Sequence, residues 1–133
     1  MLGKVEAVRG DHAFARTLYE ESLAMAQEIG DKELIVSGLE GLAGVVAGQG
    51  ELRWATQLWG TAEALREAIG APLPPVDRDD YEQAVATARD HLGIEAFAAT
   101  WAEGRAMTVE QVLTVREQAI HPHQFRQNQH LLR

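Results

Sequence analysis

Cysteine is absent from the 133-residue sequence, and serine occurs only at Ser22 and Ser37. The lack of cysteine excludes disulfide frameworks, thiolate metal sites and cysteine nucleophiles. Neither serine stands in the strand-to-helix turn that exposes a serine nucleophile, and the glycines lack the spacing of a phosphate-binding loop. We therefore predict that the chain is not an enzyme and that it holds no cofactor and no metal.

Long apolar runs are missing as well. No stretch approaches the ~20 residues that a helix needs to span a bilayer, and the first residues do not form a signal peptide. The net charge of −8 at pH 7 disfavours phosphate contacts, so we expect no direct binding of nucleic acid by this segment. We expect a cytoplasmic protein without membrane contact, in agreement with the lack of cysteine.

Sustained alternation of apolar and polar residues, the signature of a half-buried strand, is not found in the sequence. Apolar residues instead recur at intervals of three and four, which is the spacing of amphipathic helices. The predicted fold class is therefore all-α, and the length fits one domain.

A shift of the sequence by 40 residues places glycine on glycine, aromatic on aromatic and alanine on alanine. The matched pairs are Leu2/Leu42, Gly10/Gly50, Phe14/Trp54, Ala15/Ala55, Leu18/Leu58, Tyr19/Trp59, Ala24/Ala64, Ile29/Ile69 and Gly30/Gly70. A period in this range indicates tandem structural units. We predict helices over residues 11–28, 31–49 and 51–69, each closed by a glycine.

The second unit carries a specific series of large and small residues on two successive helices. The series is Leu39, Leu42, Ala43 and Val46, then Ala55, Trp59 and Ala62. It resembles a tetratricopeptide repeat (TPR). The first unit matches through Ala15, Tyr19 and Ser22, and its own first helix is only a stub at residues 2–5. The resemblance implies a right-handed stack of helical hairpins, an α-α superhelix.

Two further passages, residues 58–75 and 101–108, resemble the C-terminal ends of large bacterial ATP-binding regulators of the signal-transduction ATPase class. Such proteins often carry a LuxR-type or other DNA-binding domain besides a nucleotide-binding module and a repeat array. Because the first unit begins inside a repeat, either Met1 starts a shortened protein or the chain is the end of a longer array. We favour the second interpretation.

The predicted organisation has four parts. TPR-like repeats cover residues 1–70, and a proline-rich connector follows at residues 71–76. A helical segment at 77–120 packs on the repeats, and its last helix opens with a capping box at Thr108 and Gln111. Residues 121–133 form a polar tail.

The predicted interaction groove lies on the helix at residues 31–49. Its residues are Ser37, Glu40, Gly41, Gly44, Ala47 and Gly48. A helical glycine costs about 0.8–1.0 kcal/mol relative to alanine, so a close helix approach should offset the cost. Gly41, Gly44, Ala47 and Gly48 form a smooth surface, called here the glycine ridge, against which we predict that the closing segment or a second copy packs and fills the groove. Gly44→Leu should then disrupt assembly or folding. Peptide-binding TPR proteins place lysine, arginine and asparagine there, and their absence argues against capture of an acidic peptide terminus.

Five aromatic residues are candidates for an interface or a pocket wall: Trp54, Trp59, Tyr81, Phe97 and Trp101. Trp59 is predicted to lie in the repeat core, and Trp54 to lie at its edge, against the protein itself or a partner. Trp59 and the other three are also candidate walls of an apolar pocket between the repeats and the last helices.

Two clusters of potential metal ligands have simpler explanations. Asp77, Asp79 and Asp80 lack the glycine and glutamate of a calcium loop, and carboxylates at a helix start are stabilised by the helix dipole. The histidines at 121, 123 and 130 are predicted to belong to a solvated tail.

The leading functional prediction is a non-enzymatic protein–protein interaction module, the terminal part of a bacterial transcriptional regulator or signalling ATPase. Its partner is another protein or a second copy, because a homodimer would cover the unpaired face near Leu2, Val5, Leu18 and Tyr19. The alternative is a small-ligand sensor with an apolar pocket between the repeats and the closing helices.

Overall fold

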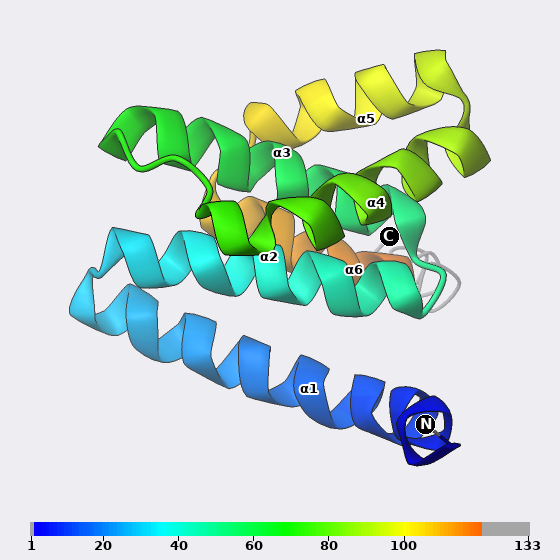
Figure 1. Cartoon of the computed structure of the whole chain (residues 1–133). Coiled ribbons are helices and arrows are strands. Elements are labelled where there is room, and N and C mark those ends of the chain that lie inside the picture. Colours follow the sequence, from blue (N-terminus) through cyan, green and yellow to red (C-terminus); the bar gives the residue numbers. More distant parts are fainter. Residues whose placement is uncertain (1, 121–133) are drawn as a thin grey trace, which may run out of the picture.

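The computed structural model describes residues 2–120, with the side chains of 12–75 and 78–115. These residues form six helices and no strand, which confirms the all-α prediction (Figure 1). The helices are α1 (Leu2–Ile29), α2 (Lys32–Gly48), α3 (Leu52–Ile69), α4 (Pro75–Leu92), α5 (Ile94–Arg105) and α6 (Val109–Ile120). Within residues 2–120, each helix is too short or too polar to cross a lipid bilayer.

Helix α1 differs from the prediction. It runs without a break for 28 residues from Leu2, so the expected start at residue 11 and the separate stub at residues 2–5 are both wrong. The physical reason is that an isolated glycine costs a helix only about 1 kcal/mol, so Gly10 is not sufficient to end it. The polar and apolar residues around it continue the helix.

The predicted helix ends at Gly30, Gly50 and Gly70 are confirmed, because all three glycines have positive φ angles. Gly70 adopts the left-handed conformation with φ 69° and donates to the carbonyl of Glu67. Asp31 caps α2, since its Oδ1 accepts a hydrogen bond of 3.1 Å from the Leu34 amide. These local signals turn the chain back twice and align α1, α2 and α3.

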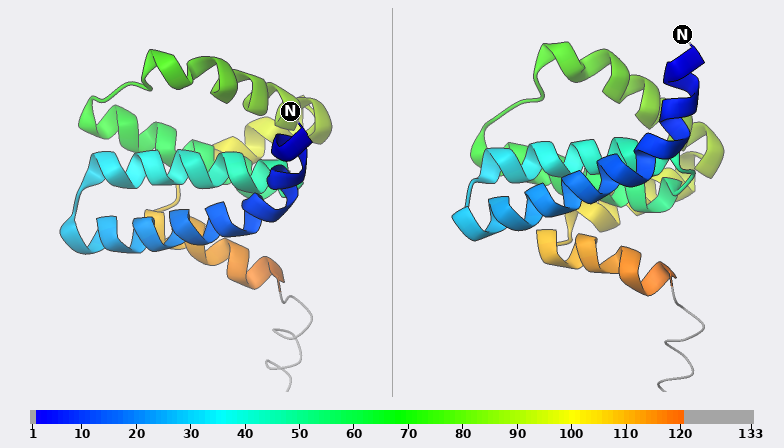
Figure 2. Two further views of the ribbon diagram at one scale, coloured as in Figure 1. Left: turned by 60° about the horizontal axis from the view of Figure 1, so that its bottom comes forward. Right: turned by 90° about the horizontal axis from the view of Figure 1, so that it is seen from below.

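Helix α2 lies between α1 and α3, and the three form one layer of hairpins (Figures 1 and 2). The large and small residues of the repeat pattern are buried where α2 and α3 meet. Leu39, Leu42, Ala43, Val46, Ala55, Trp59 and Ala62 are 0–2% exposed. The prediction of a helical-hairpin stack is therefore confirmed for the described residues.

Helix α5 packs on α3 with almost no side chain between the two backbones. A Cβ atom on Gly60 would collide with the backbone oxygen of Trp101, and one on Gly104 would collide with the backbone of Gln57. Thr61 fixes the contact by donating a 2.6 Å hydrogen bond to the carbonyl of Gly104. This pair of glycines sets how closely the closing segment approaches the repeats.

The segment between α3 and α4 is shorter than predicted, because α4 begins at Pro75. Proline is acceptable in the first turn of a helix, where its missing N–H would have no intrahelical partner. Further on, the capping box is confirmed. The Gln111 amide donates to Thr108 Oγ1 at 3.1 Å, and the Thr108 amide donates to Gln111 Oε1 at 2.9 Å.

Candidate functional site

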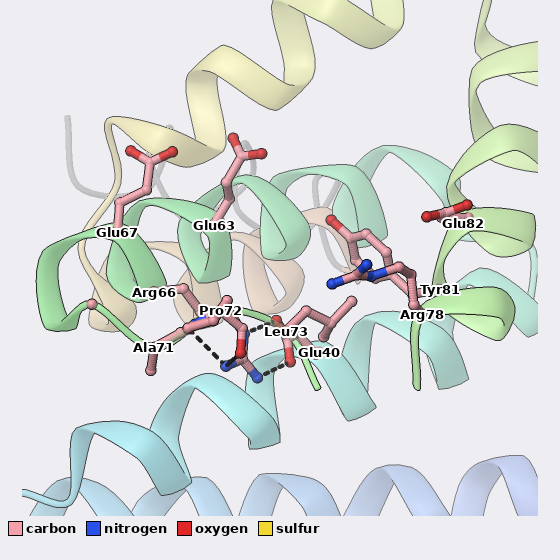
Figure 3. A pocket seen from close by; sticks show the side chains of 11 residues that line it. Glu40, Glu63, Arg66, Glu67, Ala71, Pro72, Leu73, Arg78, Tyr81 and Glu82 are labelled. Atoms are coloured by element: carbon pink, nitrogen blue, oxygen red, sulfur yellow. Dashed lines mark hydrogen bonds and ion pairs between the residues drawn. The ribbon is translucent and has the colours of Figure 1, made fainter. Parts of the chain in front are cut away.

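A hollow of about 550 Å³ lies where the chain turns back from α3 to α4, beside residues 70–73. We call it the connector pocket, and Figure 3 shows its side chains. It is lined by Glu40, Glu63, Arg66, Glu67, Gly70, Ala71, Pro72, Leu73, Arg78, Tyr81 and Glu82. The wall therefore combines an apolar connector with charged groups of both signs.

A second hollow of about 290 Å³ adjoins the connector pocket and is called here the inner groove. Glu40, Arg66, Leu73 and Tyr81 border both. The other lining residues are Tyr19, Ser37, Gly41, Gly44, Trp59, Asp80 and Ala84. Four helices, α1 to α4, thus surround one recess that has two compartments.

Arg66 forms the boundary between the two compartments. Its Nε and Nη2 each contact the Glu40 carboxylate at 2.6 Å, a two-point geometry that guanidinium groups favour. Its Nη1 also donates to the carbonyls of Ala71 at 3.0 Å and Pro72 at 3.3 Å (Figure 3). The Arg66 and Glu40 side chains are 13% and 15% exposed, so water screens this pair only in part.

Tyr81 on α4 extends from the aromatic core to the recess. Its ring meets Trp59 edge-on, with centroids 6.2 Å apart. Burial, and after it the negative charges of Glu63 and Glu40, raises the pKa of Tyr81 to about 12. Tyr81 is therefore a neutral phenol at pH 7, which can both donate and accept a hydrogen bond to a bound group.

The carboxylates on the α5 side of the connector pocket are held by Arg105. This guanidinium contacts Glu63 at 2.7 Å and Glu67 at 2.8 Å. The hydrogen bond from Arg105 lowers the pKa of Glu67, and the same contacts raise the pKa of Arg105. Trp101 Nε1 also donates to Glu63 at 2.9 Å. These contacts fix the orientation of Glu63 and Glu67, whose carboxylates remain beside the pocket.

Of the six predicted groove residues, Ser37, Glu40, Gly41 and Gly44 line the inner groove. Ala47 packs against the core, and a Cβ atom on Gly48 would meet the ring of His12.

The helix that lies against the glycine ridge is α1. A Cβ atom on Gly41 would collide with the ring of Tyr19, as one on Gly48 would with His12, and both side chains belong to α1. The prediction that the closing segment or a second copy packs here is therefore wrong at Gly41 and Gly48, where α1 occupies the space. No atom lies within 4 Å of a Cβ built on Gly44, so this position is open.

Four of the five predicted aromatic residues come together. Trp59 stacks on Trp101 with centroids 6.3 Å apart, and Phe97 lies 5.4 Å from Trp101. With Tyr81 they form one cluster that joins α3, α4 and α5, but only Trp59 and Tyr81 border the recess.

Trp54 lies apart from this cluster, at the contact between α3 and α6. It is 5% exposed, and its Nε1 donates a 2.8 Å hydrogen bond to the carbonyl of Val112. The Arg16 guanidinium lies over its ring at 5.1 Å from the centroid. In the described structure Trp54 therefore contacts the protein itself.

Arg66 was not among the site residues predicted from the sequence. A usable signal was present: Arg66 lies four residues before the glycine that ends α3. A basic side chain in the last turn of a helix can bind free carbonyl groups there.

No group of three or more metal-binding side chains occurs among the described residues. Asp79 and Asp80 lie in the first part of α4. The predicted histidine tail, with His121, His123 and His130, falls outside the described residues.

Curated proteins from Mycobacterium tuberculosis and Mycobacterium bovis match this chain at 27% identity over 110 residues. They bear the provisional name of HTH-type transcriptional regulators. The match covers 83% of this chain and 12% of each relative, so the chain spans a small part of the length of the relatives it matches. No protein-family model and no solved structure matches the chain.

Proposed function

We propose that this chain is a non-enzymatic interaction module of a bacterial transcriptional regulator or signalling ATPase, with a TPR-like helical stack as its framework. The similarity to proteins named as regulators supports the regulatory part of this proposal. Because the chain spans 12% of those relatives, its place at the C-terminal end of a longer cytoplasmic protein is part of the same proposal. DNA contact would belong to another region, since this segment carries a net charge of −8.

The inner groove is the structural feature that best supports a role in protein interaction. Its wall contains Ser37 and Gly44, both exposed, beside the aromatic rings of Tyr19 and Tyr81. Rings that combine an apolar body with a polar end are typical of protein-binding surfaces. No atom lies within 4 Å of a Cβ built on Gly44, so this part of the groove is open to a side chain from a partner protein.

Site-specific photo-crosslinking tests this proposal. A benzophenone amino acid placed at Ser37, inside the groove, should give a discrete higher-mass adduct in cells that produce the protein. The matched control is Arg53, which is exposed on α3 and does not line the recess. Adducts that are equally strong at both positions, or absent at Ser37, would contradict the proposal.

A second candidate function is that of a small-ligand sensor, and the connector pocket favours it. Its volume of about 550 Å³ falls within the range of about 300–1,000 Å³ that small-molecule sites occupy. Leu73 and Pro72 supply apolar contact, and Tyr81 supplies a polar group. Binding to the folded state alone should raise the melting temperature, by an amount that increases with ligand concentration.

A thermal-shift screen of small molecules distinguishes the two candidates. A sensor should show a shift in the wild-type protein that is lost when Leu73→Trp fills the connector pocket. Gln83→Trp, at an exposed position of α4 outside both compartments, is the matched control. A groove that binds only proteins should show no small-molecule shift in any of these variants.

A further inference from the structure

One side of α1 is apolar and is not covered by any described part of the chain. Phe14, Leu18, Met25 and Ile29 are 65%, 47%, 62% and 70% exposed. At 3.6 residues per turn, the four side chains fall within an arc of about 60° on the helix surface. They form one straight row, called here the α1 stripe, and α1 lies at the edge of the molecule (Figure 1).

The α1 stripe is separate from the side of α1 that contacts α2. Tyr19, Leu23 and His12 approach the glycines of α2, and they lie on another face of the helix. The sequence-based prediction of a homodimer grouped Tyr19 with the unpaired face, which the structure corrects. The side chains of Leu2 and Val5, also named in that prediction, lie outside the described side chains.

The internal repeat shows that the α1 stripe has the composition of a buried surface. Forty residues later, the same positions on α3 carry Trp54, Leu58, Leu65 and Ile69. Trp54 and Leu58 are 5% and 0% exposed, and the other two pack against the core. Four positions that are buried in the core or packed against it in one repeat therefore carry exposed large apolar side chains in the other, which marks an interaction surface.

The α1 stripe is also symmetric along the helix. Phe14 and Ile29 are equally distant from a point between residues 21 and 22, and so are Leu18 and Met25. Two copies of α1 packed antiparallel across a two-fold axis at this point would place Phe14 on Ile29 and Leu18 on Met25. Such self-complementarity is what a two-fold interface requires. Ser22 and Glu21, both exposed, flank this axis on opposite sides, and the small Ser22 leaves room on its side.

We propose that a second copy of this chain docks on the α1 stripe and forms a two-fold symmetric dimer through antiparallel α1 helices. The dimer leaves the recess between α1, α2, α3 and α4 free, because Tyr19 and not the α1 stripe borders it. The proposal goes beyond the interaction role of that recess, and either can fail without the other.

Sedimentation equilibrium of the full chain tests the dimer. The wild-type protein should be dimeric, and Leu18→Glu/Met25→Glu should raise the dimer dissociation constant at least about 100-fold, because buried apolar area is lost and charge enters the interface. Ile94→Glu is the matched control, since Ile94 is 76% exposed on α5, and it should leave the dimer unchanged. A monomeric wild-type protein, or a double variant that remains dimeric, would overturn the proposal and leave the stripe to another protein segment.

Crosslinking provides a second test that does not depend on disrupting the interface. The chain has no cysteine, so Ser22→Cys introduces a single thiol beside the proposed axis. A short bismaleimide should link two copies of this variant efficiently. Ala24→Cys is exposed at nearly the same height on another face of α1 and should link poorly. Equal linking of the two variants excludes this pairing, and a melting curve for each confirms that it is folded.

Discussion

Arg66 on α3 and Glu40 on α2 meet in a two-point ion pair in which both nitrogen–oxygen distances are 2.6 Å. The same guanidinium also donates to the carbonyls of Ala71 and Pro72. One side chain thereby joins two helices to the connector and forms the boundary of the connector pocket. Loss of the Arg66 side chain should therefore reduce the stability of the hairpin stack and also change the shape of the recess.

Replacement of Arg66 by methionine should lower the free energy of unfolding by about 1.5–3 kcal/mol, because a partly buried carboxylate and two carbonyl groups lose a charged donor. Urea unfolding followed by tryptophan fluorescence measures the loss. Arg66→Lys keeps the charge but not the fork geometry, so it should recover only part of the stability. Arg53→Met, at an exposed position, should change stability by about 0.5 kcal/mol or less.

Alanine substitutions at Gly104 and Gly44 should change the stability of the protein in opposite directions. Gly104→Ala should destabilise the protein by about 1–3 kcal/mol, because the new methyl group meets the backbone of Gln57 and forces α5 away from α3. Gly44→Ala should stabilise it by about 0.8–1.0 kcal/mol, since helix propensity improves and the surrounding space is open. Thermal unfolding of both variants measures the difference, and equal effects would contradict the packing of α3 on α5.

Gly44→Leu is a variant for which the structure revises the sequence-based prediction. The glycine ridge suggested that a larger residue would disrupt folding or assembly. The structure places Gly44 beside the inner groove with open space around it, so Gly44→Leu should fold normally and obstruct the groove. Photo-crosslinking from Ser37 in this background should therefore lose its adduct while the melting temperature is maintained.

The hairpin core could be predicted from the sequence because it depends on local signals. The three-four spacing of Leu39, Leu42 and Val46 identifies the buried face of α2, and Gly30 and Gly50 mark the turns. These features act within about ten residues along the chain, which is the range over which helix periodicity is reliable. The capping box at Thr108 was predictable for the same reason.

The recess and the contact between α3 and α5 could be predicted only in part because both join residues that are distant in the sequence. Gly60 and Gly104 are 44 positions apart, and nothing in the spacing of either predicts that their backbones touch. Arg66 has the sequence context of a solvated helix surface, and its role follows from the path of the connector. Burial also depends on neighbours: Tyr19 and Trp59 occupy equivalent repeat positions but are 36% and 2% exposed.

Trp54 provides a prediction about the closing segment. Trp54→Phe removes the 2.8 Å hydrogen bond to the Val112 carbonyl and part of the buried surface between α3 and α6. Stability should fall by about 1–3 kcal/mol. Hydrogen exchange should increase most in residues 109–115 of α6 and much less in α2. A uniform increase throughout the chain would show that Trp54 supports the whole fold and not the docking of α6.

Tyr81 provides a pH-dependent prediction. Its pKa of about 12 in the folded protein lies above the value of about 10 expected in the unfolded chain. The folded state therefore retains the proton that the unfolded state releases, and the resulting stability is complete below pH ~10 and is lost as the pH rises towards ~12. Unfolding measured between these pH values should show a decline that Tyr81→Phe reduces. Tyr19→Phe is the matched control, since Tyr19 is the only other tyrosine, and it should leave the decline attributed to Tyr81 in place.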